Sequence, residues 1–169
     1  LTAELLPRLE AELPLAGTPS GRCLMGSSFG AVASLSVAYR HPGVYGSLLL
    51  QSGSFAFTDI GSDHGGGPVF EPVVRFVNRY RAAPRRVADR VFVSCGVYEP
   101  LIIRNRSMVP TFEAAGLTVQ APRVPTTQDL ASAAAVLGRR CGRGAWVGYS
   151  MGGRIVAQVA AQRPQVLQQ

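Results

Sequence analysis

A short segment near the start of the chain has the pattern G-x-S-x-G, which can hold a serine hydroxyl for attack on a carbonyl carbon. It spans Gly26 to Gly30, with Ser28 at its centre. An apolar run precedes it and a segment of small, helix-compatible residues follows it, and in this context the pattern forms a sharp turn. The two glycines leave room for the turn, and the first N–H groups of the helix face the developing oxyanion. We therefore expect Ser28 to be a nucleophile and the N–H of Phe29 to be an oxyanion donor.

The same pattern occurs again near the end of the chain. The segment A-W-V-G-Y-S-M-G-G-R covers Ala145 to Arg154, with an apolar run before the serine and a helix-like segment after it. By the same reasoning Ser150 is a candidate nucleophile and Met151 a candidate oxyanion donor. Each turn lies at its own strand–helix junction and needs its own base, so the two turns do not form one site.

A serine hydroxyl is a poor nucleophile at neutral pH unless a general base, usually histidine, lies within hydrogen-bond reach. The chain has two histidines. His41 lies in an R-H-P segment after the first G-x-S-x-G, which is typical of a turn on the far side of a sheet. His64 lies in D-H-G-G-G, within the glycine-rich stretch Ser52–Pro68, which we expect to be a long, mobile loop. This loop could fold over Ser28, so His64 is the candidate base, although loop flexibility alone also explains the glycines.

Apolar runs and segments of helical periodicity alternate along the chain, as in proteins built from strands that are joined by helices. We expect strands at 23–25, 47–51, 91–95, 117–120 and 145–147, and helices at 5–13, 31–39, 69–81, 101–115, 127–139 and 152–162. This order predicts an α/β fold with a mostly parallel sheet of about five strands and helices on both faces.

The composition is that of a compact folded domain, because 47% of the 169 residues are apolar and 16% are charged. All 17 basic residues are arginine, against 10 acidic residues, and the formal net charge is +7. Arginine without lysine first indicates a coding bias. The densest cluster, between Arg75 and Arg90, also contains Asp89 and is explained by a solvated helix face, so we expect no nucleic-acid partner.

Cys23, Cys95 and Cys141 show no C-x-x-C spacing, and their odd number argues against a disulfide framework. We expect buried free thiols and neither a metal site nor another cofactor. No apolar run approaches the length of a membrane span, and the amphipathic segment Leu1–Leu15 is unlike a secretory signal. These features predict a cytoplasmic protein with no membrane partner. Because the chain begins within a helical pattern, we expect its natural beginning to be missing.

The first serine segment lies in a longer stretch that resembles the enterochelin-esterase (siderophore trilactone esterase) family of α/β-hydrolases. The stretch runs from Arg22 to Ser54 and includes M-G-S-S-F-G-A-V-A-S-L and L-L-L-Q-S-G-S. The segment S-C-G-V-Y-E-P-L-I-I-R-N-R, Ser94 to Arg106, is similar to a strand-end segment of that family, in which G-x-x-E-P lies beside the active site. The resemblance covers residues 1–119 and implies an esterase that attacks a carbonyl group through Ser28.

The resemblance also implies roles for two charged residues, and it shows what is missing. Glu99 matches the position where an acid could orient the catalytic base, although a solvated loop carboxylate explains it equally well. Arg104 lies where the family could meet an anionic substrate, or on the exposed side of a helix. The histidine that the family carries in a G-G-H segment after its last strand is absent here, because the chain reads A-P-R-V-P-T-T after Gln120.

The second serine segment resembles a different branch, the small α/β-hydrolases with G-Y-S-M-G-G, over residues 126–167. The expected organisation is a partial enterochelin-esterase-like module over 1–121, followed at 122–169 by the start of a second hydrolase unit packed into the same sheet. Together they would be an incomplete α/β-hydrolase fold, as in a fusion, a fragment or an assembly artefact.

These observations lead to two hypotheses about function. The first is a serine esterase that acts by acyl transfer on a small carboxylic ester, siderophore-like or other and with an anionic group as one option, with weak or no activity because the expected histidine is missing. The alternative is a non-catalytic hydrolase fragment or interaction module that keeps the serine turns for packing alone. The oligomeric state does not follow from the sequence.

Overall fold

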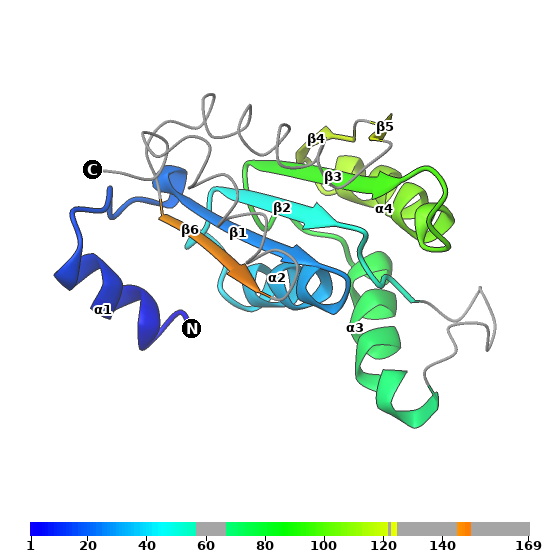
Figure 1. Ribbon diagram of the computed structural model, residues 1–169, viewed down its shortest axis with the longest axis horizontal. Coiled ribbons are helices and arrows are strands. Elements are labelled where there is room, and N and C mark those ends of the chain that lie inside the picture. The colour runs from blue at the N-terminus through cyan, green and yellow to red at the C-terminus, as the bar shows by residue number, and fades with distance from the viewer. Residues whose placement is uncertain (57–66, 122, 125–144, 150–169) are drawn as a thin grey trace.

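A computed structural model of the chain describes residues 1–56, 67–121, 123–124 and 145–149, and it has an α/β fold (Figure 1). Five strands lie in the order β4-β3-β2-β1-β6, and a short sixth strand, β5, pairs with β3. Every pairing between these strands is parallel. The predicted fold class, an α/β protein with a mostly parallel sheet, is confirmed.

Strands β1 (Arg22–Ser27), β2 (Ser47–Gln51) and β3 (Arg90–Gly96) form the middle of the sheet. All five residues of β2 are buried, as are all but the first residue of β1 and of β3. Such continuous burial is typical of parallel strands that are covered on both faces. The outer strands are β4 (Thr118–Gln120), β5 (Arg123–Val124) and β6 (Ala145–Tyr149).

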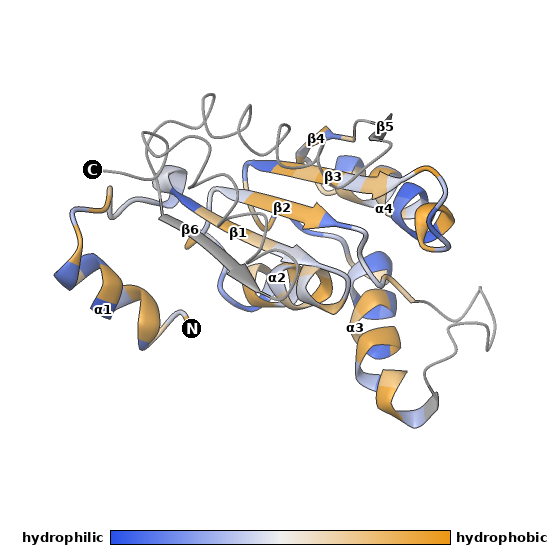
Figure 2. Ribbon diagram, in the orientation of Figure 1, coloured by the Kyte–Doolittle hydropathy of each residue, from blue (hydrophilic) through white to orange (hydrophobic). Residues whose placement is uncertain are grey.

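Four α-helices lie among the described residues: α1 (Leu5–Glu12), α2 (Phe29–Arg40), α3 (Glu71–Ala82) and α4 (Ile102–Ala114). Short 3₁₀ turns, η1 (Pro19–Gly21) and η3 (Gly67–Phe70), lead into β1 and α3. Helix α3 shows why such segments become helical. It carries an acidic residue and a proline in its first turn and buries Val74, Val77 and Tyr80, which lie on one side of a helix. Figure 2 shows the alternation of apolar and polar residues along this helix.

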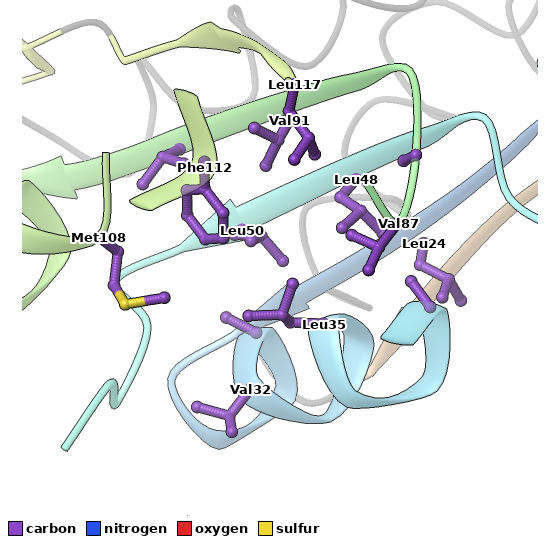
Figure 3. Packing of buried hydrophobic residues seen from close by; sticks show 14 of the residues in the cluster. Leu24, Val32, Leu35, Leu48, Leu50, Val87, Val91, Met108, Phe112 and Leu117 are labelled. Carbon is purple, nitrogen blue, oxygen red and sulfur yellow. The ribbon is translucent and has the colours of Figure 1, made fainter. Parts of the chain in front are cut away.

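The core is one cluster of apolar side chains between the sheet and helices α2, α3 and α4 (Figure 3). From the strands it takes alternate residues such as Leu48 and Leu50, because successive side chains of a strand point to opposite faces. From the helices it takes residues such as Leu35 of α2 and Phe112 of α4, both fully buried. The alternate strand residue Leu49 is buried as well, at 1% exposure. The strands are therefore held in place by packing on both faces of the sheet, and this fixes the positions of the residues at their ends.

Strand β6, which ends directly before Ser150, lies in the same sheet as β1, which ends directly before Ser28. Strand β6 pairs with β1 in parallel, and Tyr149 stands in register with Gly26. Both serine segments therefore follow strands that end at the same edge of the sheet. The helices expected at 127–139 and 152–162 lie outside the described residues, and the division into modules at 121 and 122 stays a prediction.

The first part of the glycine-rich stretch differs from the expected mobile loop. Residues 52–56, which follow β2, are all buried, and Phe55 and Ala56 are fully so. Backbone bonds to neighbouring segments hold them, including one from the Ser54 N–H to the Ser28 carbonyl at 3.2 Å. These residues form a loop, as predicted, but a buried and hydrogen-bonded one, and the sequence did not predict this because their bonding partners are distant in the chain. Residues 57–66 lie outside the described part.

The thiols of Cys23 and Cys95 are buried and form no disulfide, as predicted, and Cys141 lies outside the described residues. Within the ranges that the structure describes, no helix is long and apolar enough to cross a membrane.

Candidate functional site

The backbone turns sharply between β1 and α2, and Ser28 occupies the turn. Its φ of 56° and ψ of −120° lie in a region that residues other than glycine rarely adopt. The Ser28 N–H donates to the Gln51 carbonyl at 3.0 Å, and the Ser28 carbonyl accepts the N–H of Ala31 at 3.2 Å. A strand that ends, a residue with positive φ and a helix that begins at once together form the geometry that lifts a serine hydroxyl above the edge of a sheet.

Gly26 allows this turn because β1 and the first turn of α2 almost touch. A Cβ atom at Gly26 would lie 2.0 Å from the carbonyl oxygen of Gly30 and 2.7 Å from the nitrogen of Ala31. Real side chains do not approach backbone atoms so closely. The pattern therefore needs glycine at its first position for steric reasons.

Phe29 is the first residue of α2, and so its N–H is one of the donors that has no acceptor within the helix. The helix dipole places partial positive charge at the same end. The Phe29 side chain is 47% exposed, and its ring centroid lies 4.8 Å from that of Phe70 at the start of α3. The beginnings of α2 and α3 thus meet next to Ser28.

A second serine, Ser54, faces Ser28. The two Oγ atoms are 3.0 Å apart, and either can be the donor. Ser54 belongs to the segment Ser52–Ser54, in which Ser52 also has a positive φ of 43°. The segment turns across the end of β2, and this brings the second hydroxyl to the first.

Glu99 lies in the turn between β3 and α4, at the same edge of the sheet. Its Oε1 accepts hydrogen bonds from the Ser52 hydroxyl at 2.9 Å and from the Gly96 N–H at 3.0 Å. Both of these bonds go to Oε1, and each oxygen of an ionised carboxylate can accept more than one hydrogen bond. Glu99 is partly buried and is held by its neighbours, unlike a carboxylate on a loose loop.

The Cys95 thiol lies beside this carboxylate. Burial raises the pKa of the Cys95 thiol to about 11, and the negative charge of Glu99 is the second largest cause of this shift. The thiol is therefore protonated at neutral pH and is a weak nucleophile. A small pocket of about 50 Å³ opens between β3 and α4, with Cys95, Asn105 and Arg106 among its lining residues.

The buried side chain of Asn105, on α4, bonds to the backbone of Gly53. The Gly53 N–H donates to Asn105 Oδ1 at 2.9 Å, and Asn105 Nδ2 donates to the Gly53 carbonyl at 3.0 Å. Nδ2 also donates to the carbonyl of Leu101 at 2.9 Å. Helix α4 thereby holds the segment that faces Ser28.

Of the residues singled out in the sequence, Ser28, Phe29 and Glu99 come to the same edge of the sheet. Arg104 lies in the first turn of α4, partly buried. His64, Ser150 and Met151 lie outside the described residues. His41 follows the last residue of α2, about 18 Å along the helix from Ser28, and is too far away to act on it.

Three residues near Ser28 were missed in the sequence: Ser52, Ser54 and Asn105. All three are polar residues that lie in or next to apolar runs, and this is the one feature of the local sequence that could have indicated their burial. Ser94 and Asn105 occur in the segment that resembles the esterase family, but nothing in the residue spacing shows that Asn105 faces Gly53. In the described ranges, no group of three or more His, Cys, Asp or Glu side chains is placed to hold a metal ion.

Solved structures with the same fold are esterases and related hydrolases. The chain is similar to an enterobactin esterase from Shigella flexneri, crystallised in the presence of 2,3-dihydroxy-N-benzoyl-glycine, with 22% identity and a TM-score of 0.56. That match covers 72% of this chain and 31% of the esterase. A ferulic acid esterase matches with 20% identity and a TM-score of 0.58, over 73% of this chain and 50% of the other.

An S-formylglutathione hydrolase from Staphylococcus aureus matches with 14% identity and a TM-score of 0.54, over 80% of this chain and 55% of the other. These likenesses show the fold, and the chain spans about a third to about a half of the length of the proteins that it matches. The comparison with curated proteins gives no match.

The match to a protein family covers most of the chain and is not limited to the residues of the site. The model of the esterase family described as "Putative esterase" matches residues 1–128, which include β1 to β5 and the turns at Ser28 and Glu99. The fused second hydrolase expected at the end of the chain is not part of this match. The chain belongs to this esterase family.

Proposed function

We propose that the chain carries the nucleophile of a serine esterase and cleaves a small carboxylic ester by acyl transfer to Ser28. The observation that carries this proposal is the strained turn at Ser28, with the N-terminal end of α2 directly behind it. A strained backbone of this kind costs free energy, and such strain is concentrated at functional sites. Membership of the esterase family supports the same reaction type.

In the proposed reaction the Ser28 Oγ attacks the ester carbonyl carbon and gives its proton to a base. The electron pair of the C=O bond moves to the carbonyl oxygen, where the Phe29 N–H donates a hydrogen bond to it. The C–O bond to the alcohol then breaks, and the alcohol leaves with the proton. Water attacks the acyl-serine in a second step of the same kind, which releases the acid and restores Ser28.

The reaction also needs a general base within hydrogen-bond reach of the Ser28 hydroxyl. Glu99 is suited to orient an imidazole, because two bonds fix its carboxylate at the edge of the sheet and a carboxylate can accept a further N–H. His64 is the candidate for that imidazole, and it lies ten residues beyond Ser54 in the chain. If His64 does not reach Ser28, we expect weak or no turnover.

The proposed substrates are small esters, siderophore-like or other, and an anionic group on the substrate would suit the arginines of α4. Arg104 lies in the first turn of α4, and Arg106 lines the pocket beside Cys95. The enterobactin esterase with the similar fold was crystallised with an aromatic amide of glycine, which carries a carboxylate. Ser150 and Met151 remain candidates for a second nucleophile and its oxyanion donor.

The test is covalent labelling of the 169-residue chain with a fluorophosphonate probe, followed by peptide mass spectrometry. We expect the probe on Ser28, no labelling of that peptide in Ser28→Ala, and slower labelling in His64→Ala. Ser150→Ala is the matched control for the other serine segment. Labelling that is absent from Ser28, or equal in Ser28→Ala, would overturn the proposal and would favour the non-catalytic alternative.

A further inference from the structure

The segment Ser52–Ser54 determines the surroundings of the Ser28 hydroxyl. The Ser54 Oγ lies 3.0 Å from the Ser28 Oγ, and the Ser54 N–H donates to the Ser28 carbonyl at 3.2 Å. One residue thus contacts both the side chain and the backbone of Ser28. Any shift of this segment would move the hydroxyl partner of the nucleophile.

The middle residue of the segment, Gly53, has little freedom to shift by itself. A Cβ atom at Gly53 would lie 2.2 Å from the ring of Phe55, which is fully buried. Its N–H and its carbonyl both bond to the Asn105 side chain, at 2.9 Å and 3.0 Å. Hydrogen bonds formed away from water are costly to lose, and Asn105 is 2% exposed.

The chemistry at this position suits a carboxamide of this length. Oδ1 accepts one hydrogen bond, and Nδ2 donates two, to the carbonyls of Gly53 and Leu101. An ionised aspartate has the same size but no donor, so its second oxygen would face two carbonyl oxygens. An alanine would leave all three backbone groups without this partner.

We propose that Asn105 is a positioning residue for the reaction at Ser28. It holds Gly53 from both sides, and this keeps the Ser54 hydroxyl opposite the Ser28 hydroxyl. Through Leu101 it also ties this geometry to the start of α4, directly after the turn that carries Glu99. The inference rests on the proposed function, because it concerns the rate at which Ser28 is acylated.

The test compares Asn105→Asp with Met108→Ala in the 169-residue chain. Met108 is one turn further along α4 and fully buried, so its truncation destabilises the same helix and leaves the hydrogen bonds between Asn105 and Gly53 in place. We expect the maximal rate of fluorophosphonate labelling, per folded molecule, to fall roughly tenfold or more in Asn105→Asp and to be unchanged in Met108→Ala. The probe concentration that gives half of the maximal rate should stay the same.

A double-mutant cycle with Ser54→Ala asks whether Asn105 acts through Ser54. If it does, the combined variant should label only as slowly as the slower single variant, because both changes remove one arrangement. If the two reductions in labelling rate multiply, Asn105 does not act through Ser54, and the inference is overturned. Asn105→Ser, which is smaller and still polar, replaces Asn105→Asp in the same comparison if the latter does not fold.

The outcomes separate this inference from the proposed function. If Ser28 is labelled in the unmodified chain and Asn105→Asp labels as fast as Met108→Ala, the inference is overturned and the proposed function stands. If Ser28 is not labelled in the unmodified chain, the proposed function is overturned, and the inference about its rate is overturned with it.

Discussion

The turn at Ser28 depends on a contact between two backbone segments that leaves no space for a side chain at Gly26. In Gly26→Ala the new methyl group would lie 2.0 Å from the Gly30 carbonyl oxygen. Since these are backbone atoms, the strand and the helix must separate. We expect a loss of roughly 3 kcal/mol or more in the free energy of unfolding, measured by urea denaturation, together with loss of Ser28 labelling.

Gly116→Ala is the matched control for this change. Gly116 has a φ of +76°, but a Cβ atom there meets nothing within 4 Å. We expect a loss of about 1 kcal/mol, from backbone strain alone, and unchanged labelling. A loss in Gly26→Ala no larger than that in Gly116→Ala would show that the close contact with Gly30 does not determine the cost.

The Cys95 thiol gives a prediction about pH. Its pKa is raised from the ordinary thiol value of 9.0 to about 11, chiefly by burial and then by the charge of Glu99. The folded chain thus holds the thiol proton more tightly than the unfolded chain does. This contribution to stability is complete below about pH 9 and is lost as the pH rises to about 11.

The corresponding measurement is the rate of Cys95 alkylation in the folded chain as a function of pH. We expect slow alkylation near pH 9 and a rise toward pH 11, and Glu99→Gln should shift the rise to lower pH because it removes a neighbouring negative charge. Glu113→Gln, an exposed carboxylate on α4, is the control and should leave the profile unchanged. A profile that Glu99→Gln does not move would contradict the assigned cause.

At this scale the sequence predicts what is local and misses what is distant. The strand, turn and helix around Ser28 follow from adjacent residues, because the G-x-S-x-G pattern lies between an apolar run and a segment of small, helix-compatible residues. Ser54 and Asn105 were not predicted as site residues. They meet Ser28 and Gly53 across 26 and 52 positions of the chain, and no periodicity encodes such a pairing.

Among the elements, α1 is tied to the sheet by one partly buried ion pair. Arg22, the first residue of β1, donates from Nε and Nη2 to the two carboxylate oxygens of Glu10, at 2.6 Å and 2.9 Å. The two side chains are 16% and 22% exposed. Glu10→Gln would leave the arginine without its charged partner, and we expect a loss of about 1 to 3 kcal/mol in the free energy of unfolding.

Glu12→Gln is the matched control on the same helix. Glu12 pairs with Arg8 at 2.9 Å, but the two side chains are 59% and 77% exposed. Water screens this pair, so we expect a loss below about 1 kcal/mol. If urea denaturation gives the same loss for both variants, the Glu10–Arg22 pair does not anchor α1.

Element boundaries show a similar division between local and distant causes. The strand over Ser47–Gln51 was predicted to the residue, because polar and glycine-rich turns enclose a short apolar run. The helix expected from Ala31 begins at Phe29, since the turn at Ser28 leads directly into it. The serine- and glycine-rich segment that follows β2 is a loop, as its composition predicts, but its burial depends on distant residues and was not predicted.

For the whole molecule, the position of β6 decides whether the end of the chain belongs to the esterase sheet. It pairs with β1 along five residues, from Arg22 opposite Ala145 to Gly26 opposite Tyr149. Without β6, the backbone edge of β1 would be open, and open edges of buried strands favour aggregation. The strand that leads into Ser28 therefore depends on a segment 123 positions away.

Val147→Pro tests this pairing, because proline removes a backbone N–H and does not fit the interior of a sheet. Val147 stands opposite Leu24 in the middle of the pairing. We expect a loss of roughly 3 kcal/mol in the free energy of unfolding, and aggregation visible by light scattering at lower temperature than for the unmodified chain.

Val147→Ala keeps the N–H and is the control for the side chain alone. If the proline and alanine variants unfold and aggregate alike, β6 does not pair with β1 in solution, and the last part of the chain is a separate unit that contributes nothing to the sheet around Ser28.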